Sequence, residues 1–414
     1  MRDLHSGAVI DEHNANINFP PASVNKLLVS LAILEELGKN YKYKTILSTN
    51  SNIAAHTATK NNSIDGNIIL SLSADPSLSH KNLEQLFKPL ANKIITGNLI
   101  INSDDSNDIS YAPGWIWDDL SYMPPITNML LDQDRFHLRI ISNGKIKLAT
   151  DLPKNILQFN NLLVQTNAKN CLVAIYPEKY GYQARGCLAG SRRKNEAIIR
   201  ELVLRDPQTY FKYWLDQIML QQHIKLSGKI IIKNTHPGKI IISEHKSKNL
   251  ASFLTHMLAV SDNVYAEEFL KKIAREYKNS SSSLYFVTNY QRGAHAVKEI
   301  LRKVDHLNLQ HMTYDDGSGL SRYDALNPKF LSSLLVHARR NAAWPTWKKI
   351  IAKYGAHNTI LLIPFKLPKH YRLIAKTGSM TGVLSLAGYM EAPGKRAISF
   401  AIMLNGIYRH NGYR

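Results

Sequence analysis

The sequence predicts an α+β protein in which helices pack on an antiparallel sheet and a β-rich insert interrupts the helical part. An apolar helical pattern over residues 23–37 and three closely spaced strand patterns after residue 371 predict the helices-on-sheet domain. Between residues 45 and 205, short apolar runs alternate with Asn, Asp, Ser and Gly, which is typical of strands joined by turns.

A chain of 414 residues exceeds the size at which one hydrophobic core usually keeps growing, so more than one packed unit is expected. The first 45 residues are too few to bury a core alone and must pack with the C-terminal part of the chain. We therefore predict one discontinuous domain, residues 1–45 plus 205–414, and an inserted β-rich region, residues 46–204.

The first predicted helix begins at Ser23, directly after Pro20 and Pro21. Its apolar residues recur at helical spacing, at Leu27, Leu31 and Leu34. Gly38 follows them at the position where a helix commonly ends.

After residue 205 the helical pattern returns, and the tail of the chain is strand-like. Three helices are predicted, at Tyr210–Gln221, Leu250–Ala259 and Asn263–Arg275. Three strands are predicted, at Arg372–Ala375, Leu384–Met390 and Ala397–Leu404. Their short connections favour an antiparallel meander, with Pro393 and Gly394 in the last turn.

The chain is strongly basic, with 52 Lys and Arg residues against 32 Asp and Glu residues and a formal net charge of +20. This balance favours an anionic partner such as nucleic acid, anionic lipid or a wall polymer. The basic residues are spread along the chain, and neither zinc-finger spacing nor an aromatic-basic RNA motif occurs, so we expect no nucleic-acid partner. No run of 18 apolar residues predicts a membrane-spanning helix.

Two features of the sequence leave alternatives open. Cys171 and Cys187 either form a disulfide or are two small buried residues. At the N-terminus, no apolar signal segment precedes the strand-like run Gly7–Ile10. The protein therefore either stays in the cytoplasm, or its first residues belong to a truncated or misassigned reading frame.

The first motif that carries chemistry is Ser23-Val24-Asn25-Lys26. A spacing of three residues in a helix puts the Ser23 hydroxyl and the Lys26 amine on one face. The helix start favours a developing alkoxide on Ser23, and an amine with a lowered pKa can take its proton. Taken alone, the pair is better explained by a serine helix cap.

Two further motifs have a structural and a functional interpretation. Ser261-Asp262-Asn263 is either a plain helix cap or a hydroxyl and an amide that relay a proton and hold substrate. Lys376-Thr377-Gly378-Ser379 is either a strand that runs into a polar turn or a strand edge that binds substrate. In the second case Gly378 permits close approach, Lys376 attracts a carboxylate, and the Ser379 N–H completes an oxyanion hole with the Ser23 N–H.

In this order, S-x-x-K, S-D-N and K-T-G resemble the motifs of the penicillin-binding proteins and serine β-lactamases. Four longer runs narrow the resemblance to the class C low-molecular-mass penicillin-binding proteins, which are serine-type D-alanyl-D-alanine carboxypeptidases/endopeptidases. These runs are Phe19–Ser23, Pro113–Asp119, Ser261–Glu267 and Asp316–Arg322. The resemblance covers nearly the whole chain. It implies a β-lactamase/transpeptidase-like domain and two β-rich subdomains inserted after the first helix.

The resemblance assigns roles to the residues of the three motifs. It implies that Ser23 is the nucleophile and Lys26 the acylation base. The remaining motif residues would relay protons or bind substrate, namely Ser261, Asn263, Lys376, Thr377, Gly378 and Ser379.

Three other residues match positions that in relatives contact the end of the stem-peptide side chain: Asp119, Arg322 and Met380. A zwitterionic side-chain end needs one anion and one cation, which agrees with Asp119 and Arg322. The alternatives are a turn residue for Asp119 and a structural ion pair for Arg322.

The implied reaction is acylation of Ser23 by a D-Ala-D-Ala peptide or a D-Ala-diaminopimelate crosslink of peptidoglycan, followed by hydrolysis. Penicillin would acylate the same serine, and no metal or organic cofactor would be needed. The implied location is the periplasm, where a basic protein could associate loosely with the wall or a membrane. The resemblance leaves open the balance of carboxypeptidase and endopeptidase activity and the oligomeric state.

Two other functions compete with this hypothesis. A β-lactamase-like hydrolase or esterase would not need an insert of this size, which suits an extended polymer. A degenerate penicillin-binding module or a basic nucleic-acid binder would not need intact motifs. The sequence also departs from the family: Asn358–Leu361 replaces a G-T-L-like segment, and the first strand and the closing helix look shortened. These departures leave full activity and stability as open questions.

Overall fold

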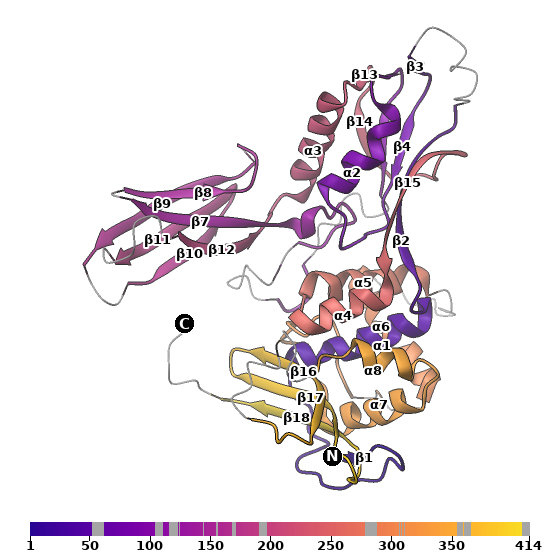
Figure 1. The fold of residues 1–414 in the computed structure, drawn as a ribbon, viewed down its shortest axis with the longest axis vertical. Helices are drawn as coiled ribbons and strands as arrows, with labels where there is room; N and C mark the ends of the chain where they lie inside the picture. The colour runs from indigo at the N-terminus through magenta and orange to yellow at the C-terminus, as the bar shows by residue number, and fades with distance from the viewer. Residues whose placement is uncertain are drawn as a thin grey trace. The chain divides into compact units, whose positions relative to one another are not determined.

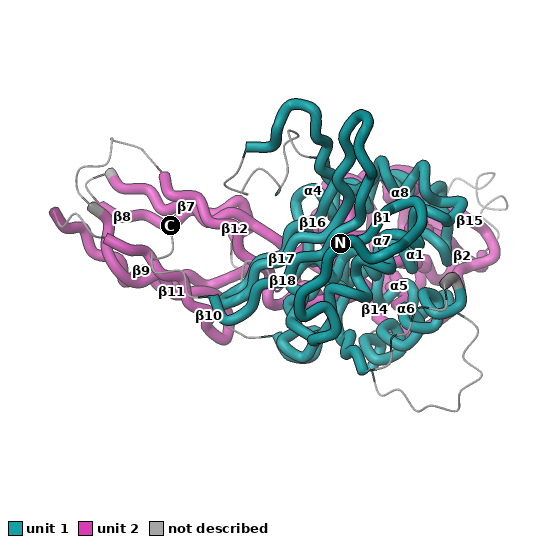
Figure 2. Tube along the Cα trace, turned by 90° about the horizontal axis from the view of Figure 1, so that it is seen from below, with its two compact units in different colours: residues 1–43, 112–115, 248–414 teal, residues 44–111, 116–247 magenta. Residues whose placement is uncertain are grey.

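The computed structural model describes residues 1–51, 62–103, 111–115, 123, 125–143, 145–154, 156–167, 171–189, 197–277, 288–305, 307, 309, 311–353, 359 and 366–407. The chain forms two compact units (Figure 2). Unit 1 contains residues 1–43, 112–115 and 248–414, and unit 2 contains residues 44–111 and 116–247.

A four-stranded antiparallel sheet forms one layer of unit 1 (Figure 1). Its strand order is β1-β18-β17-β16, with bounds Arg2–Asp3, Ile398–Asn405, Val383–Glu391 and Arg372–Met380. The predicted meander is therefore correct, but the run Gly7–Ile10 is not a strand, and β1 is only two residues long. β16 also continues past Ala375, because Lys376–Met380 pair with β17 as far as Val383.

Helices form the rest of unit 1. Their bounds are Ala22–Asn25 for the 3-10 helix η1, then Lys26–Leu37 (α1), Leu250–Val260 (α4), Asn263–Glu276 (α5), Asn289–Asp305 (α6), Pro328–Arg340 (α7) and Trp344–Ile350 (α8). α1 packs against α4, α5 and α6, while α7 packs on β17 and β18. Every residue of α1 from Lys26 to Leu34 is buried, so this helix lies at the centre of the helical layer. The predicted α+β class, with helices on an antiparallel sheet, is confirmed.

Unit 2 begins with a sheet-and-helix layer. A five-stranded sheet has the order β14-β6-β4-β2-β15, with bounds Ile230–Lys233, Leu99–Asn102, Ile68–Ser71, Lys42–Thr49 and Ile240–Asn249. A small sheet contains β13 (Lys225–Leu226), β5 (Ile94–Ile95) and β3 (Ser63–Ile64). Helices α2 (His80–Phe87) and α3 (Pro207–Gln221) pack against each other, and two 3-10 turns, η3 and η5, cover Lys88–Leu90 and Asp132–Asp134.

Two three-stranded sheets complete unit 2. One has the order β12-β7-β8, with bounds Ala197–Val203, Arg135–Asn143 and Lys145–Thr150. The other has the order β10-β11-β9, with bounds Val173–Glu178, Gly181–Ala189 and Gln158–Thr166. Phe136 of the first sheet meets Phe159 and Tyr182 of the second, with ring centroids 6.0 and 5.9 Å apart. Their apolar side chains belong to the same hydrophobic core as the sheet-and-helix layer.

The inserted unit is longer than the sequence indicates. Residues 205–247, predicted to belong to the first domain, lie in unit 2, because α3 packs on α2 and β14 and β15 pair into its sheet. The Asp206 carboxylate caps α3 by accepting a hydrogen bond from the Thr209 N–H at 3.0 Å. The cap and the helical periodicity predict that α3 forms, but they do not indicate the core against which it packs. In the described part of the chain, no helix has the length and apolar character needed to cross a membrane.

Cys171 and Cys187 are joined by a disulfide that ties the segment before β10 to β11. The bond closes a loop with a sequence separation of 16 residues. Closing a loop of about this length in the unfolded chain is worth about 3 kcal/mol in the chain-entropy model.

The double variant Cys171→Ser/Cys187→Ser should therefore destabilise the β9–β11 sheet by about 3 kcal/mol. Amide hydrogen exchange across residues 158–189 should become roughly a hundredfold faster. Wild-type protein reduced with dithiothreitol is the matched control and should behave alike. Unchanged exchange in both samples would show that the bond contributes nothing.

Candidate active site

Ser23 lies in η1, directly before the buried helix α1. Its side chain is partly exposed, whereas Val24, Asn25 and Lys26 are fully buried. The preceding residue, Ala22, has a φ of 50°, in the left-handed region that costs energy for a side chain with a Cβ. A hydroxyl held in a tight turn at a helix start is thus presented to solvent, and the amine one turn later is hidden from it.

Lys26 has three hydrogen-bond acceptors for its three N–H groups. Its Nζ donates to Ser23 Oγ at 3.1 Å, to Asn263 Oδ1 at 2.7 Å and to Ser318 O at 2.8 Å. Burial lowers the pKa of Lys26 to about 8, against the carboxyl groups of Asp316, Glu267 and Asp262, which favour the ammonium form. Lys26 is therefore within hydrogen-bond distance of the hydroxyl it would deprotonate, with a pKa suited to that task.

A second buried amine faces the other serine. Lys376 Nζ donates to Ser261 Oγ at 2.9 Å and to Thr377 O at 2.7 Å. Burial holds the pKa of Lys376 well below its ordinary value, and the charge of Lys26 adds to the decrease. The two amines are thus close enough to repel each other, which favours a neutral form of one of them.

Asp262, not Ser261, caps helix α5. The Asp262 carboxylate accepts a hydrogen bond from the Val264 N–H at 3.0 Å. Ser261 ends α4 with a φ of 63° and turns its hydroxyl to Lys376. The helix-cap interpretation of this motif therefore holds for Asp262, while Asn263 in the first turn of α5 accepts a hydrogen bond from Lys26.

The third motif lies within β16, and its glycine brings the strand against Ser23. A Cβ on Gly378 would lie 2.1 Å from Ser385 Oγ and 2.9 Å from the Ser23 nitrogen, so no larger residue fits. Ser385 Oγ in turn donates to Pro21 O at 2.5 Å. The strand edge that carries Thr377 and Ser379 is thereby fixed beside η1, which contains Ser23.

The structure brings together most of the predicted site residues. Ser23, Lys26 and Asn263 form one hydrogen-bonded group, and Ser261 and Lys376 form another. Thr377 Oγ1 donates to Thr359 Oγ1 at 2.7 Å. Thr359 is the one residue of the Asn358–Leu361 segment that the structure describes.

The predicted side-chain subsite is only partly visible. Arg322 Nη1 donates to Thr381 O at 3.1 Å, in the turn directly after Met380. Met380 is half-buried at the end of β16. Asp119 lies outside the described residues.

Sequence reasoning missed a buried acidic network behind Lys26. Asp316 accepts hydrogen bonds from Trp115 Nε1 at 2.7 Å, Gly319 N at 2.5 Å and Ser321 N at 2.8 Å. Asn25 Nδ2 donates to Asp316 O at 2.9 Å and to Asp324 Oδ2 at 2.9 Å. In the sequence, Trp115 and the Asp316–Arg322 run are noticed only because they resemble the family. Carboxylates that bind backbone N–H groups can pair with any residue type, so they produce no recognisable spacing.

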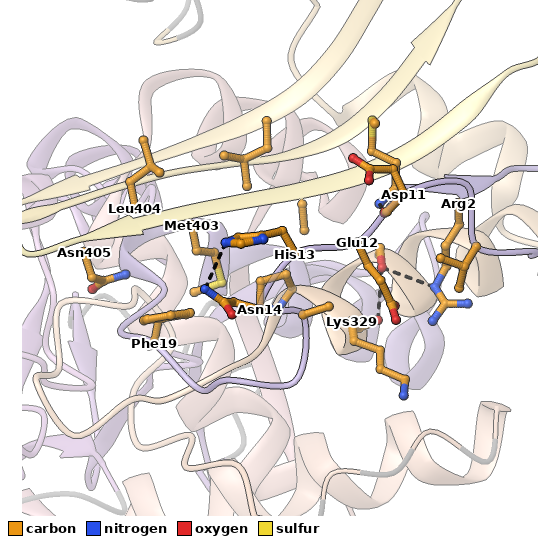
Figure 3. A pocket seen from close by; sticks show the side chains of 17 residues that line it. Arg2, Asp11, Glu12, His13, Asn14, Phe19, Lys329, Met403, Leu404 and Asn405 are labelled. Atoms are coloured by element: carbon orange, nitrogen blue, oxygen red, sulfur yellow. Dashed lines mark hydrogen bonds between the residues drawn. The ribbon is translucent and has the colours of Figure 1, made fainter.

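A separate hollow of about 520 Å³ lies beside β18 (Figure 3). Its lining includes Phe19, Lys329, Met403 and the loop that carries His13 and Asn14. None of the predicted catalytic residues lines this hollow. This hollow is therefore separate from the hydrogen-bonded groups around Ser23.

Comparison with known proteins agrees with the motifs. The sequence model of the D-Ala-D-Ala carboxypeptidase 3 (S13) family matches residues 1–413. The D-alanyl-D-alanine carboxypeptidase DacB of Haemophilus influenzae is 26% identical over 422 residues, which cover 98% of this chain and 84% of that protein. The penicillin-sensitive carboxypeptidase A of Dictyostelium discoideum is 24% identical, over 94% of this chain and 78% of that protein.

Solved structures share the fold. The crystal structure of penicillin binding protein 4 (dacB) from Haemophilus influenzae superimposes with a TM-score of 0.82 at 25% identity, covering 99% of this chain and 90% of that one. A structure of the same protein complexed with a novel β-lactam gives a TM-score of 0.77.

Replacing Trp115 with Phe should test the network behind the site. Trp115→Phe removes the N–H that donates to the buried carboxylate of Asp316, which should cost about 1.5–3 kcal/mol of unfolding free energy. Chemical denaturation measures the loss. Trp344→Phe is the control, since the Trp344 indole N–H donates to no described residue, and it should cost less. Equal losses in the two variants would contradict a specific role for the Trp115 hydrogen bond.

Proposed function

The chain belongs to the D-Ala-D-Ala carboxypeptidase 3 (S13) family, and from this premise we propose that it is a serine-type D-Ala-D-Ala carboxypeptidase that forms an acyl-enzyme on Ser23 and binds penicillin. The observation that carries the proposal is the hydrogen bond from the buried Lys26 amine to Ser23 Oγ. A partly exposed hydroxyl beside an amine with a lowered pKa is the arrangement that nucleophilic acyl transfer needs. The family predicted from the three motifs is confirmed.

In the proposed acylation, neutral Lys26 takes the hydroxyl proton of Ser23 while Ser23 Oγ bonds to the carbonyl carbon of the penultimate D-Ala. The N–H groups of Ser23 and Ser379 stabilise the oxyanion that forms. The carbon–nitrogen bond to the terminal D-Ala then breaks, and the departing amine takes up, through the Ser261 hydroxyl, the proton that Lys26 removed from Ser23, which leaves Lys26 neutral again. Ser261 is placed for this relay by its hydrogen bond from Lys376.

The remaining residues hold the substrate. The terminal carboxylate of the peptide pairs with Lys376 and with the Thr377 hydroxyl at the β16 edge. Asn263 binds the substrate, and Gly378 lets the peptide backbone come close to the strand. A water molecule then loses a proton to neutral Lys26 and bonds to the ester carbon. The bond from that carbon to Ser23 Oγ breaks, and Lys26 returns the proton to Ser23 Oγ. Arg322, whose guanidinium donates to Thr381 O beside Met380, binds the end of the stem-peptide side chain. We place this activity on peptidoglycan stem peptides in the periplasm, with no metal in the mechanism.

Ser23→Ala should abolish covalent labelling by a fluorescent penicillin and release of D-Ala from a D-Ala-D-Ala pentapeptide. The substitution removes only the attacking oxygen, so the fold should persist, as circular dichroism can check. Ser30→Ala, a serine on the same buried helix that donates to Lys26 O, is the control and should still label. Labelling of the Ser23→Ala variant at the wild-type rate would refute the proposal. Fast turnover of penicillin with no action on muropeptides would identify a β-lactamase instead.

The rate constant of acylation should rise as the pH increases through about 8. Burial has lowered the pKa of Lys26 to about this value, and only the neutral amine can accept the Ser23 proton. Stopped-flow or gel-based labelling with penicillin from pH 6 to pH 10 measures the rate constant. A profile that is flat through pH 8, or one that falls there, would exclude Lys26 as the base.

A further inference from the structure

The turn that follows Asp315 is wrapped around two buried carboxylates. Gly317 N and Ser318 N donate to the two oxygens of Glu267, at 3.0 and 2.8 Å. Gly319 N and Ser321 N donate to the two oxygens of Asp316, at 2.5 and 2.8 Å. Glu267, Asp316 and Ser318 have no exposed surface. Four N–H donors of one short turn therefore bind two carboxylates, and the carbonyl groups of the turn are oriented as a consequence.

One of these carbonyl groups belongs to the candidate active site. Ser318 O accepts the third N–H of Lys26 at 2.8 Å. The peptide unit that carries this carbonyl also carries the Gly319 N–H, which donates to Asp316. A carboxylate at the N–H end of a peptide group polarises it and makes its carbonyl a stronger acceptor.

Helix α5 reaches Lys26 by two routes. Asn263 and Glu267 are four residues apart, so they project from the same face of α5. Asn263 contacts Lys26 directly, whereas Glu267 contacts the two N–H groups of the turn whose carbonyl contacts Lys26. The turn cannot move away from the helix freely, because a Cβ on Gly317 would already lie 2.2 Å from Ala266 O.

From this geometry we infer that Glu267 is a positioning residue for acylation, which holds the Ser318 carbonyl on Lys26 and supplies a negative charge that counters the burial of the amine. This inference deepens the proposed function and rests on it. In the described part of the chain, Glu267 makes no hydrogen bond to Ser23 or to β16, so it acts through the turn and through its charge.

Other charged groups also act on Lys26. Asp316 and Asp262 favour its ammonium form, as Glu267 does, and the charge of Lys26 in turn lowers the pKa of Lys376. Asp324 lies behind Asp316, and burial together with Asp316 raises its pKa well above the usual range. Burial and the charge of Asp316 raise the pKa of Glu267 to about 8, although two N–H donors on its oxygens and the charge of Lys26 favour the ionised form. In its ionised form Glu267 favours the ammonium form of Lys26, and the other carboxyl groups of the site stay in place when it is changed.

Two variants separate the two parts of this role. Glu267→Gln keeps the shape but removes the charge and one acceptor. Without that charge the pKa of Lys26 should fall, so the midpoint of the pH–rate profile should move down by about one unit. Glu267→Asp keeps the charge but shortens the reach, so its midpoint should stay while its maximal rate falls by about tenfold to a hundredfold.

The experiment measures first-order labelling by a fluorescent penicillin at each pH, normalised to the end point, in the full chain. A rate constant obtained this way does not depend on how much of the variant has folded. Glu268→Gln is the matched control, because it makes the same change at the next, equally buried position of α5, and it should leave the midpoint unchanged.

An unshifted midpoint in Glu267→Gln would overturn the inference, since a merely structural role changes the labelled amount and not the midpoint. An equal shift in Glu268→Gln would overturn it as well, because any buried carboxyl group of α5 would then have the same effect. Failure of the proposed function itself is distinguishable, because wild-type protein would then not be labelled at all.

Discussion

The burial of the Lys26 amine is the constraint on which the rest of unit 1 depends. An amine without exposed surface has lost its water, so each of its N–H groups needs an acceptor from the protein. The three acceptors come from three separate segments, since Ser23 lies in η1, Asn263 at the start of α5 and Ser318 in the turn before α7. Satisfying one amine therefore fixes how these segments pack around α1.

Each buried charge in the site needs a buried partner, either an opposite charge or a hydrogen-bond donor. The Lys26 ammonium form is favoured by Glu267 and Asp316, which would themselves be costly to bury without donors. Backbone N–H groups and the Trp115 indole supply those donors. The segment 112–115 belongs to unit 1, and its Trp115 indole supplies one of these donors to the buried carboxylate of Asp316. Removing one member leaves its neighbour buried and unpaired, which costs more than the bond itself contributes.

The spacing and order of the three motifs predict that their residues lie in one site. The structure brings Lys26 to Asn263 and Lys376 to Ser261, two pairings that the sequence did not predict. Glu267 has no such signature, because it binds backbone N–H groups that every residue offers. The limits of the insert were also misjudged: α3 has helical periodicity, but periodicity identifies the face that is buried and not the unit that buries it.

The glycines of the motifs are explained by contact between backbones. Gly317 lies on Ala266 O, Gly319 on Ala22 O and Gly378 beside the Ser23 nitrogen, each at a distance where a Cβ would clash. These three approaches place the acidic turn on α5, the same turn on η1, and β16 on η1. Backbone contacts of this kind leave little room for adjustment, so the distances from Lys26 to its acceptors are set by the chain and not by flexible side chains. A site assembled in this way is organised before substrate arrives, which is what a transition-state-stabilising arrangement of N–H groups requires.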